Sequence, residues 1–232
     1  MNVLAIGAYA SEIAQLCGGT LAKCSVAGHS VAIAALCCTG TRFPEHTEEN
    51  AAADVQEFRD SAAVIGARCH NLNLPQFDLS DDYDTRMRVV EVMRQEQAKL
   101  IITHDRDDYG RDHRTTSGIV TESVYMAMQP GIKTSVPTLA EHPDVVFMDT
   151  IAGIAFEPEQ YVDITDVFEL KRRMLMAFAR EVKEWAGHPV LNHMEWLEAT
   201  ARFRGIQSGY RYAEAFRWPH RWGFAPSEPM LI

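Results

Sequence analysis

The first forty residues constrain the fold of this chain more than any other stretch. Residues 3–6 (Val-Leu-Ala-Ile) are a short uncharged apolar run, which is typical of a buried parallel strand. A helical pattern follows at once and stops near Gly28, and a second apolar run covers residues 31–36. Strand, loop, helix and strand in this order predict a βαβ unit. Because ligands bind beyond the carboxyl ends of the strands in such sheets, we expect residues 8–12 to lie at a functional site.

The alternation of strands and helices continues along the rest of the chain. Periodicity and breaker residues predict helices over 51–65, 84–99, 115–128, 167–185 and 192–203, and strands over 69–74, 100–103, 145–148, 153–156 and 161–165. This pattern predicts an α/β fold, a Rossmann-like three-layer sandwich with a mostly parallel sheet. We expect one domain over residues 1–232. Its Rossmann-like core would cover 1–130, and the strands and helices of 131–232 would complete the site.

Composition and charge narrow the classes of partner and compartment. The formal net charge of −10 argues against a nucleic-acid partner, which would require a basic face. No apolar run approaches the length that spans a bilayer, and no basic segment precedes the first strand as in a signal peptide. The five cysteines are odd in number and lie in apolar surroundings, which favours reduced, buried thiols. We therefore expect a cytoplasmic protein that binds neither membranes nor nucleic acids.

The loop after the strand at 100–103 is dense in groups that bind metals or move protons. It reads His-Asp-Arg-Asp-Asp-Tyr-Gly-Arg-Asp-His-Arg over residues 104–114. A divalent metal takes imidazole and carboxylate ligands, and the same groups serve as general acids and bases. Two plainer interpretations stay open. Asp105, Asp107 and Asp108 are also typical of a solvated loop, and His104 of a hydrogen-bonded histidine at a strand end.

Several motifs give the chain a resemblance to a known family. The strand, the sequence GGTLAK at 18–23, the Gly-His pair at 28–29 and Thr-Gly at 39–40 resemble the start of the PIG-L/LmbE family of zinc-dependent N-deacetylases. That family reads Ala-His-Pro-Asp-Asp where this chain has Ala8, Tyr9, Ala10, Ser11 and Glu12. The family's His and second Asp bind zinc, and its first Asp is the general base. The resemblance implies that Glu12 keeps a carboxylate ligand, while Tyr9 and Ser11 replace the other two roles.

The same resemblance extends to the acidic loop. The family's loop ends in His-x-Asp-His, and the chain has Gly110, Arg111, Asp112 and His113 there. The resemblance implies that His113 is a metal ligand and that the first His, which stabilises the oxyanion in the deacetylases, is lost at Gly110. It implies a zinc ion, or another divalent metal, held by Glu12 and His113. The alternative is a loop acid and a histidine at a helix N-terminus with no metal. We expect His104, Asp112 and Asp108 to handle protons.

Substrate-binding residues are expected around these two loops and near the C-terminus. Residues 202–216 resemble the family's closing motif, with an arginine-glycine pair and the sequence YAEAF. Two arginines before a glycine turn can form a bidentate anion clamp, and surface arginines around a tight turn are the plainer alternative. A further departure from the family is Asp54, where the helix usually carries an arginine three residues before a glutamate. The residues expected to contact substrate are Tyr9, Ser11, Arg114, Arg202 and Arg204.

Three functions remain open from the sequence. The first is hydration of a small polyanionic substrate, because the 4-oxalomesaconate hydratase branch of the family also lacks the first Asp and the first His. The segment 156–173 (FEPEQYVDITDVFELKRR) also resembles that branch. The second is deacetylation of an amino-sugar derivative with a rearranged base. The third is a non-catalytic ligand-binding protein. The family resemblance also implies a small polar or anionic substrate and self-association into a homo-oligomer.

Overall fold

One sheet of seven strands organises the chain over the residues that the computed structural model describes, which are 1–38, 47–186 and 192–220. The strand order is β3-β2-β1-β4-β5-β7-β6. The strands are β1 (Asn2–Tyr9), β2 (Ser30–Cys37), β3 (Arg68–Asn71), β4 (Leu100–Thr103), β5 (Asp144–Met148), β6 (Gln160–Asp163) and β7 (Ala213–Arg217). The helices are α1 (Ala10–Val26), α2 (Glu48–Ala63), α3 (Tyr83–Glu96), α4 (Arg111–Ala127), α5 (Phe168–Met176), α6 (Ala179–Trp185) and α7 (His193–Ser208).

Strands β1 to β5 are parallel, and their carboxyl ends meet at one edge of the sheet. β1 lies between β2 and β4, so Ile6 pairs with Ala34 on one side and with Thr103 on the other. β7 pairs antiparallel with β5 and β6, which closes that side of the sheet. The predicted mostly parallel sheet is therefore confirmed. Because β1 and β4 are neighbours, residues 8–12 and 104–114 emerge side by side.

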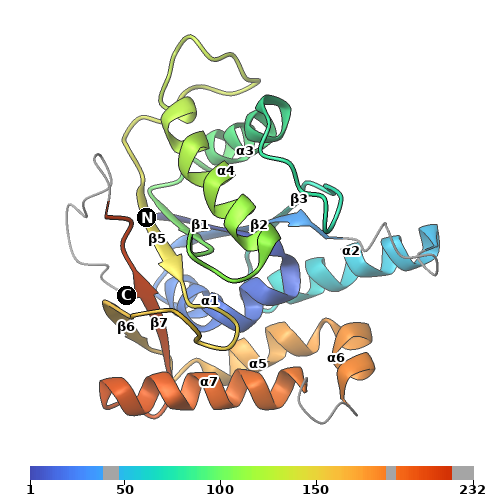
Figure 1. Cartoon of the computed structure of the whole chain (residues 1–232), viewed down its shortest axis with the longest axis vertical. Helices are drawn as coiled ribbons and strands as arrows, with labels where there is room; N and C mark the ends of the chain where they lie inside the picture. Colours follow the sequence, from blue (N-terminus) through green and yellow to red (C-terminus); the bar gives the residue numbers. More distant parts are fainter. Residues whose placement is uncertain (39–46, 187–191, 221–232) are drawn as a thin grey trace.

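Helices cover both faces of the sheet, which confirms the predicted three-layer sandwich. Figure 1 shows α3 and α4 on one side of the sheet and α1, α2, α5 and α7 on the other. The uncharged strands support both layers because alternate residues point to opposite faces. On β1, Val3 and Ala5 join the core beneath α1, and Leu4 and Ile6 join the core beneath α3 and α4.

Local signals explain where several helices begin and end. The Asp82 carboxylate accepts a hydrogen bond from the Thr85 amide at the start of α3, and Asn192 caps α7 in the same way. α7 ends at Gly209, whose φ of +81° is the left-handed conformation that glycine adopts without strain. α7 therefore runs five residues beyond the predicted end at residue 203.

The C-terminal part differs from the prediction in two places. Residues 153–156 do not form a strand, because Gly153 and Ala155 have φ of +68° and +58°. The position beside β5 is taken instead by β7, which was not predicted. The long helix predicted over 167–185 is broken, because Phe178 leaves helical geometry (φ −81°, ψ 59°) and buries its ring in the core.

The helices and the cysteines bear on what the composition predicts about membranes and disulfides. Among the described helices, none combines the length and apolar composition that crossing a lipid bilayer requires. All five cysteines are free thiols.

Candidate metal centre at the carboxyl ends of β1 and β4

Two helix starts and one strand end bring three ligand-type side chains together. α1 begins directly after β1, which places Glu12 in its first turn. α4 begins at Arg111, which places His113 in its first turn. His104 follows the last residue of β4. Because β1 and β4 are adjacent and parallel, these three side chains converge at one point.

The three side chains form a compact cluster. One ligand atom from each of Glu12, His104 and His113 lies within 4.8 Å of the other two. The His113 Nε2 atom lies 3.0 Å from the Glu12 carboxylate, and His104 Nε2 lies 3.7 Å from it. The two imidazole rings stack at a centroid distance of 4.2 Å. Two histidines and one carboxylate are a donor set that catalytic zinc sites use.

The charge states of the three groups differ. Burial and the nearby His113 hold the pKa of His104 well below its usual value, so His104 is neutral. Burial favours a low pKa for His113, but the Asp108 and Glu12 carboxylates outweigh it and raise the pKa to about 10. Burial raises the pKa of Glu12 in spite of the hydrogen bond from His113. In the absence of a cation, therefore, His113 is the histidine of the cluster that carries a proton, and it faces the Glu12 and Asp108 carboxylates.

These residues fit a divalent cation, provided that the cation replaces the Ala8 amide as the partner of His104 Nε2. His104 is already in the neutral form that a metal requires. His113 has Asp108 Oδ1 3.0 Å from its Nδ1, which is the carboxylate support that metal-ligating histidines usually have. The Ala8 amide donates to His104 Nε2 at 2.9 Å, so a cation would take over that lone pair. The expected pair of Glu12 and His113 thus gains His104 as a third candidate ligand.

Asp108 lies behind His113 and is fully buried. Its Oδ1 atom accepts a hydrogen bond of 2.6 Å from the Gly110 amide, while Oδ2 is buried without a hydrogen-bond partner in the described residues. Arg114 donates to the Asp108 backbone carbonyl at 2.6 Å. The interpretation of a wholly solvated acidic loop is wrong, since Asp105 and Asp108 are each only 1% exposed.

Tyr9 and Asp112 bond to each other beside the cluster. The Tyr9 hydroxyl donates to Asp112 Oδ2 at 2.6 Å, and the Phe77 amide donates to the same atom at 2.8 Å. Burial and this bond to Asp112 raise the pKa of Tyr9 well above its usual value, so the phenol keeps its proton. Asp112 therefore fixes Tyr9 and the loop at Phe77. Ser11 is buried in the first turn of α1.

Gly110 leaves room for the ring of His113. A Cβ atom at this position would lie 2.7 Å from His113 Nδ1 and 3.0 Å from Cγ, which is closer than such atoms approach in proteins. The absence of the family's histidine at position 110 and the present orientation of His113 are thus linked.

The two predicted clamp arginines do not act together. Arg204 is buried and forms a bidentate ion pair with Asp149, with Nε 2.6 Å from Oδ2 and Nη2 3.0 Å from Oδ1. Arg202 is exposed, and its guanidinium lies over the Tyr212 ring at 5.6 Å. The segment at Gly205 is helical, and the turn comes at Gly209.

One further arginine at this end of the sheet, Arg217, was not predicted from the sequence. Arg217 at the end of β7 forms ion pairs with Asp105 and with Asp107, the latter at 2.8 Å. Arg217 follows directly after the YAEAF motif, but only the unpredicted strand β7 brings it to the loop after β4. Asp54, the other departure noted in the sequence, pairs with Arg180 at 2.6 Å.

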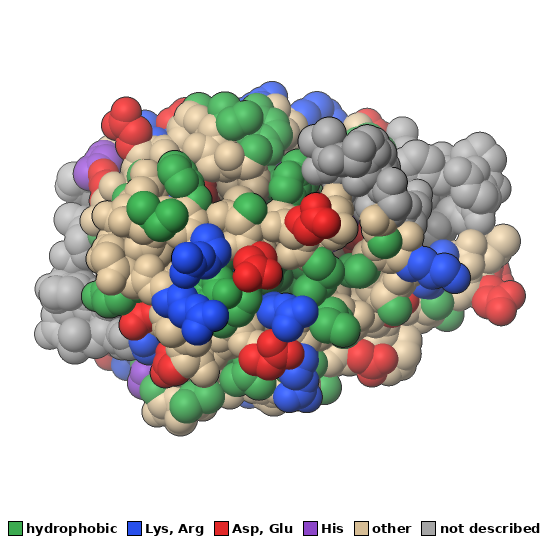
Figure 2. Space-filling view, turned by 90° about the horizontal axis from the view of Figure 1, so that it is seen from below, with side chains coloured by type: hydrophobic (Ala, Val, Ile, Leu, Met, Phe, Trp, Pro, Cys, Tyr) green, Lys and Arg blue, Asp and Glu red, His purple; other side chains and the backbone are tan. Residues whose placement is uncertain are grey.

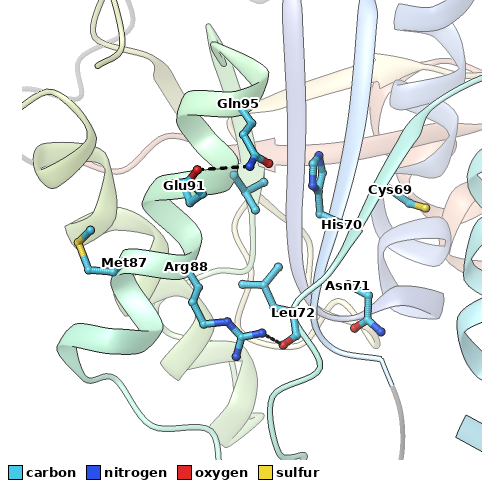
Figure 3. A pocket seen from close by; sticks show the side chains of 9 residues that line it. Cys69, His70, Asn71, Leu72, Met87, Arg88, Glu91 and Gln95 are labelled. Atoms are coloured by element: carbon cyan, nitrogen blue, oxygen red, sulfur yellow. Dashed lines mark hydrogen bonds between the residues drawn. The ribbon is translucent and has the colours of Figure 1, made fainter. Parts of the chain in front are cut away.

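A separate groove lies between β3 and α3 and contains none of the three candidate ligands (Figure 3). It has a volume of about 600 Å³. Its polar side chains are bonded within the protein, as Glu91 to Gln95 and Arg88 to the Leu72 carbonyl (Figure 3). The chemistry of the candidate metal centre is not repeated there.

The chain is similar in sequence to a protein family and to several known proteins. Residues 4–124 match the family model for GlcNAc-PI de-N-acetylase (PIG-L). The chain is 27% identical to diacetylchitobiose deacetylase of Thermococcus kodakarensis, over 94% of this chain and 82% of that one. It is 22% identical to 4-oxalmesaconate hydratase of Pseudomonas putida, over 89% of this chain and 81% of that one.

Solved structures agree on the fold. A conserved protein from Thermus thermophilus superposes with a TM-score of 0.81 at 20% identity, covering 98% of this chain and 99% of that one. The 4-carboxy-2-hydroxymuconate hydratase of Pseudomonas putida gives a TM-score of 0.78 at 20% identity, covering 97% and 100%. These likenesses show the shared fold.

Proposed function

Because this chain belongs to the GlcNAc-PI de-N-acetylase (PIG-L) family, we propose that it is a metal-dependent enzyme that adds or removes water on a small anionic substrate. The observation that carries this proposal is the convergence of Glu12, His104 and His113 within 4.8 Å at the carboxyl ends of β1 and β4. A divalent cation bound there would act as a Lewis acid toward water or a substrate oxygen.

The residues around the cluster favour hydration over amide hydrolysis. Ser11 occupies the position at which the family has its general base, an aspartate. A serine hydroxyl does not replace a carboxylate base at neutral pH. Asp112, Asp105 and Asp149 are each committed to a partner inside the protein. Asp108 keeps one carboxylate oxygen without a hydrogen-bond partner in the described residues and supports His113, so we assign Asp108 to proton handling and keep His113 as a metal ligand.

Deacetylation of an amino-sugar derivative is the second candidate. The 27% identity to a diacetylchitobiose deacetylase over most of both chains favours it. In that reaction Asp108 would have to serve as the base in place of the residue at position 11.

Metal analysis tests the shared part of both candidates. We expect about one divalent ion per chain in protein purified without a chelator or a histidine tag, and a large loss in His113→Ala and in His104→Ala. Tyr9→Phe is the matched control and should keep the metal, since the protonated phenol is not a ligand. Absence of metal from the wild type would contradict the proposal and favour a non-catalytic ligand-binding protein.

Substrate assays then separate the two reactions. Metal-loaded protein is expected to hydrate unsaturated dicarboxylates or tricarboxylates. The loss of the ultraviolet absorbance of the double bond measures this reaction. Release of acetate from N-acetylglucosamine conjugates, without hydration, would replace the first candidate with the second.

A further inference from the structure

We propose that the junction of α5, α7 and the start of β7 is a binding site for a small oxyanion, distinct from the candidate metal centre. A groove of about 380 Å³ opens there, lined by Thr165, Phe168, Glu169, Arg172, Glu198, Arg211 and Tyr212. None of the three candidate metal ligands lines it.

A stacked aromatic pair forms the floor of this groove. The rings of Phe168 and Tyr212 lie parallel with centroids 3.7 Å apart, so Phe168 covers one face of Tyr212. The Tyr212 hydroxyl bonds to Glu198 at 3.1 Å, which fixes the ring in its plane. This rigid platform holds the residues that would contact the anion.

Two guanidinium groups lie against Tyr212. The Cζ atoms of Arg202 and Arg211 are 5.6 Å and 5.4 Å from its ring centroid, which is cation–π distance. Arg202 also donates to the Arg211 backbone carbonyl at 3.2 Å. The two positive charges are therefore held near each other by the same side chain.

Neither guanidinium has a carboxylate partner in the described part of the chain. Arg211 makes its cation–π contact, and its side chain has no hydrogen bond or ion pair to residues 1–38, 47–186 or 192–220. Within the same residues, the side chain of Arg202 donates only to the Arg211 carbonyl. Of the two carboxylates in the groove, Glu169 pairs with Arg172 at 2.9 Å, and Glu198 accepts the hydrogen bond of the Tyr212 hydroxyl. In a protein of net charge −10, two guanidinium groups over one ring, neither with an ion-pair partner in the described residues, indicate a place for an external anion.

Figure 2 looks from below onto the face that carries α7, where Lys and Arg side chains gather near the middle with acidic side chains between them. Arg202 and Arg204 are two residues apart on α7, about 200° around the helix axis, so they point to different sides. Arg204 is used inside the protein, whereas Arg202 lies over the ring of Tyr212, which lines the groove. The ligand class is a phosphate or a carboxylate on a small molecule, since a planar guanidinium binds both through paired N–H groups.

The test is a titration with inorganic phosphate and with citrate at constant ionic strength. The chemical shifts of the backbone NMR signals of Arg202, Arg211 and Tyr212 are measured at each step. Because the signals are local, an anion bound at the metal centre does not enter the result. We expect saturable shifts in the wild type, and an affinity at least about tenfold lower in Arg211→Ala and in Arg202→Ala. Arg211→Lys should retain part of the binding.

Arg59→Ala is the matched control, because Arg59 is also an exposed arginine on a helix, away from this groove. It should bind like the wild type. Thermal unfolding of each variant verifies that the fold is intact. Shifts that do not saturate, or that decrease equally in Arg59→Ala and Arg211→Ala, would overturn the proposal. Binding of only one of the two probes would assign the site to phosphoryl or to carboxylate ligands.

Discussion

At the scale of single residues, the departures from the family pattern are linked through contacts. Tyr9 stands where the family has a metal-binding histidine, and it donates to Asp112 instead. His104, at the end of the neighbouring strand β4, is the third candidate ligand. The candidate ligands thus come from the end of β4 and from the first turns of α1 and α4, with His104 in place of a ligand at position 9.

Replacing Tyr9 by phenylalanine measures the bond to Asp112. The substitution removes a hydroxyl that donates to a carboxylate at 2.6 Å, and we expect the free energy of unfolding to fall by about 2 kcal/mol. Urea denaturation is the measurement. Tyr83→Phe is the control, since Tyr83 is 63% exposed, and it should change stability little. Equal effects of the two substitutions would show that the bond to Asp112 adds nothing.

Adding one methyl group at Gly110 tests the position of His113. Because the new Cβ would lie 2.7 Å from His113 Nδ1, Gly110→Ala should displace the ring and lower metal affinity by about tenfold. Gly118→Ala, within α4, is the control, because the nearest contact of its new Cβ would be an ordinary 3.5 Å. Isothermal titration with Zn²⁺ gives both affinities, and unchanged binding in Gly110→Ala would contradict the link between these residues.

At the scale of elements, α1 is held in the middle by a buried ion pair from β7 and α5. The Glu214 carboxylate accepts the amides of Gly19 at 2.8 Å and Thr20 at 2.7 Å, and it pairs with Lys171. Lys171 also donates to the Gln15 carbonyl, which is the acceptor of the Gly19 amide in a regular helix. The helix that carries Glu12 is therefore anchored by the C-terminal part of the chain.

A double-mutant cycle on Lys171 and Glu214 tests this anchor. Lys171→Met or Glu214→Gln alone should cost about 3 to 5 kcal/mol of stability, because the partner is left buried and uncompensated. The double variant should cost less than the sum. The exposed pair of Arg172 and Glu169 is the control and should contribute less than about 1 kcal/mol. Additive effects at the buried pair would contradict the coupling.

At the scale of the whole molecule, one carboxylate at the end of α3 makes stability depend on pH. Burial alone would raise the pKa of Glu96, but hydrogen bonds from Arg68 and His70 outweigh burial and lower it. A carboxylate with a lowered folded pKa stabilises the protein above its unfolded pKa of about 4.3, and this contribution disappears as the pH falls through the folded value.

Glu96→Gln should therefore be less stable than the wild type near pH 7, and the difference should shrink below about pH 4. Urea unfolding at a series of pH values gives the comparison, with the exposed Glu157→Gln as control. A difference between wild type and Glu96→Gln that is constant with pH would sink this explanation.

Much of the core could be predicted because its signals are local. The uncharged runs at 3–6, 31–36 and 100–103 are strands, and their parallel pairing follows from the helices between them. The C-terminal part was harder to predict. Residues 153–156 contain an apolar run like that of a strand, yet the backbone turns at Gly153 and Ala155. β7 was missed because antiparallel pairing at this edge depends on neighbours that are distant in sequence.

By itself, the sequence determined the α/β class, the family, and the two loops at which ligand-type residues gather, since each rests on short runs and spacings. Only the tertiary structure decided which side chains meet. It placed His104 beside Glu12 and His113, and it brought the Tyr9 hydroxyl into hydrogen-bonding distance of Asp112. It also paired Arg204 with Asp149, so that Arg204 does not act together with Arg202. The physical reason is that charge pairs and ligand sets depend on distances of about 3 Å between residues a hundred positions apart, which no local pattern encodes.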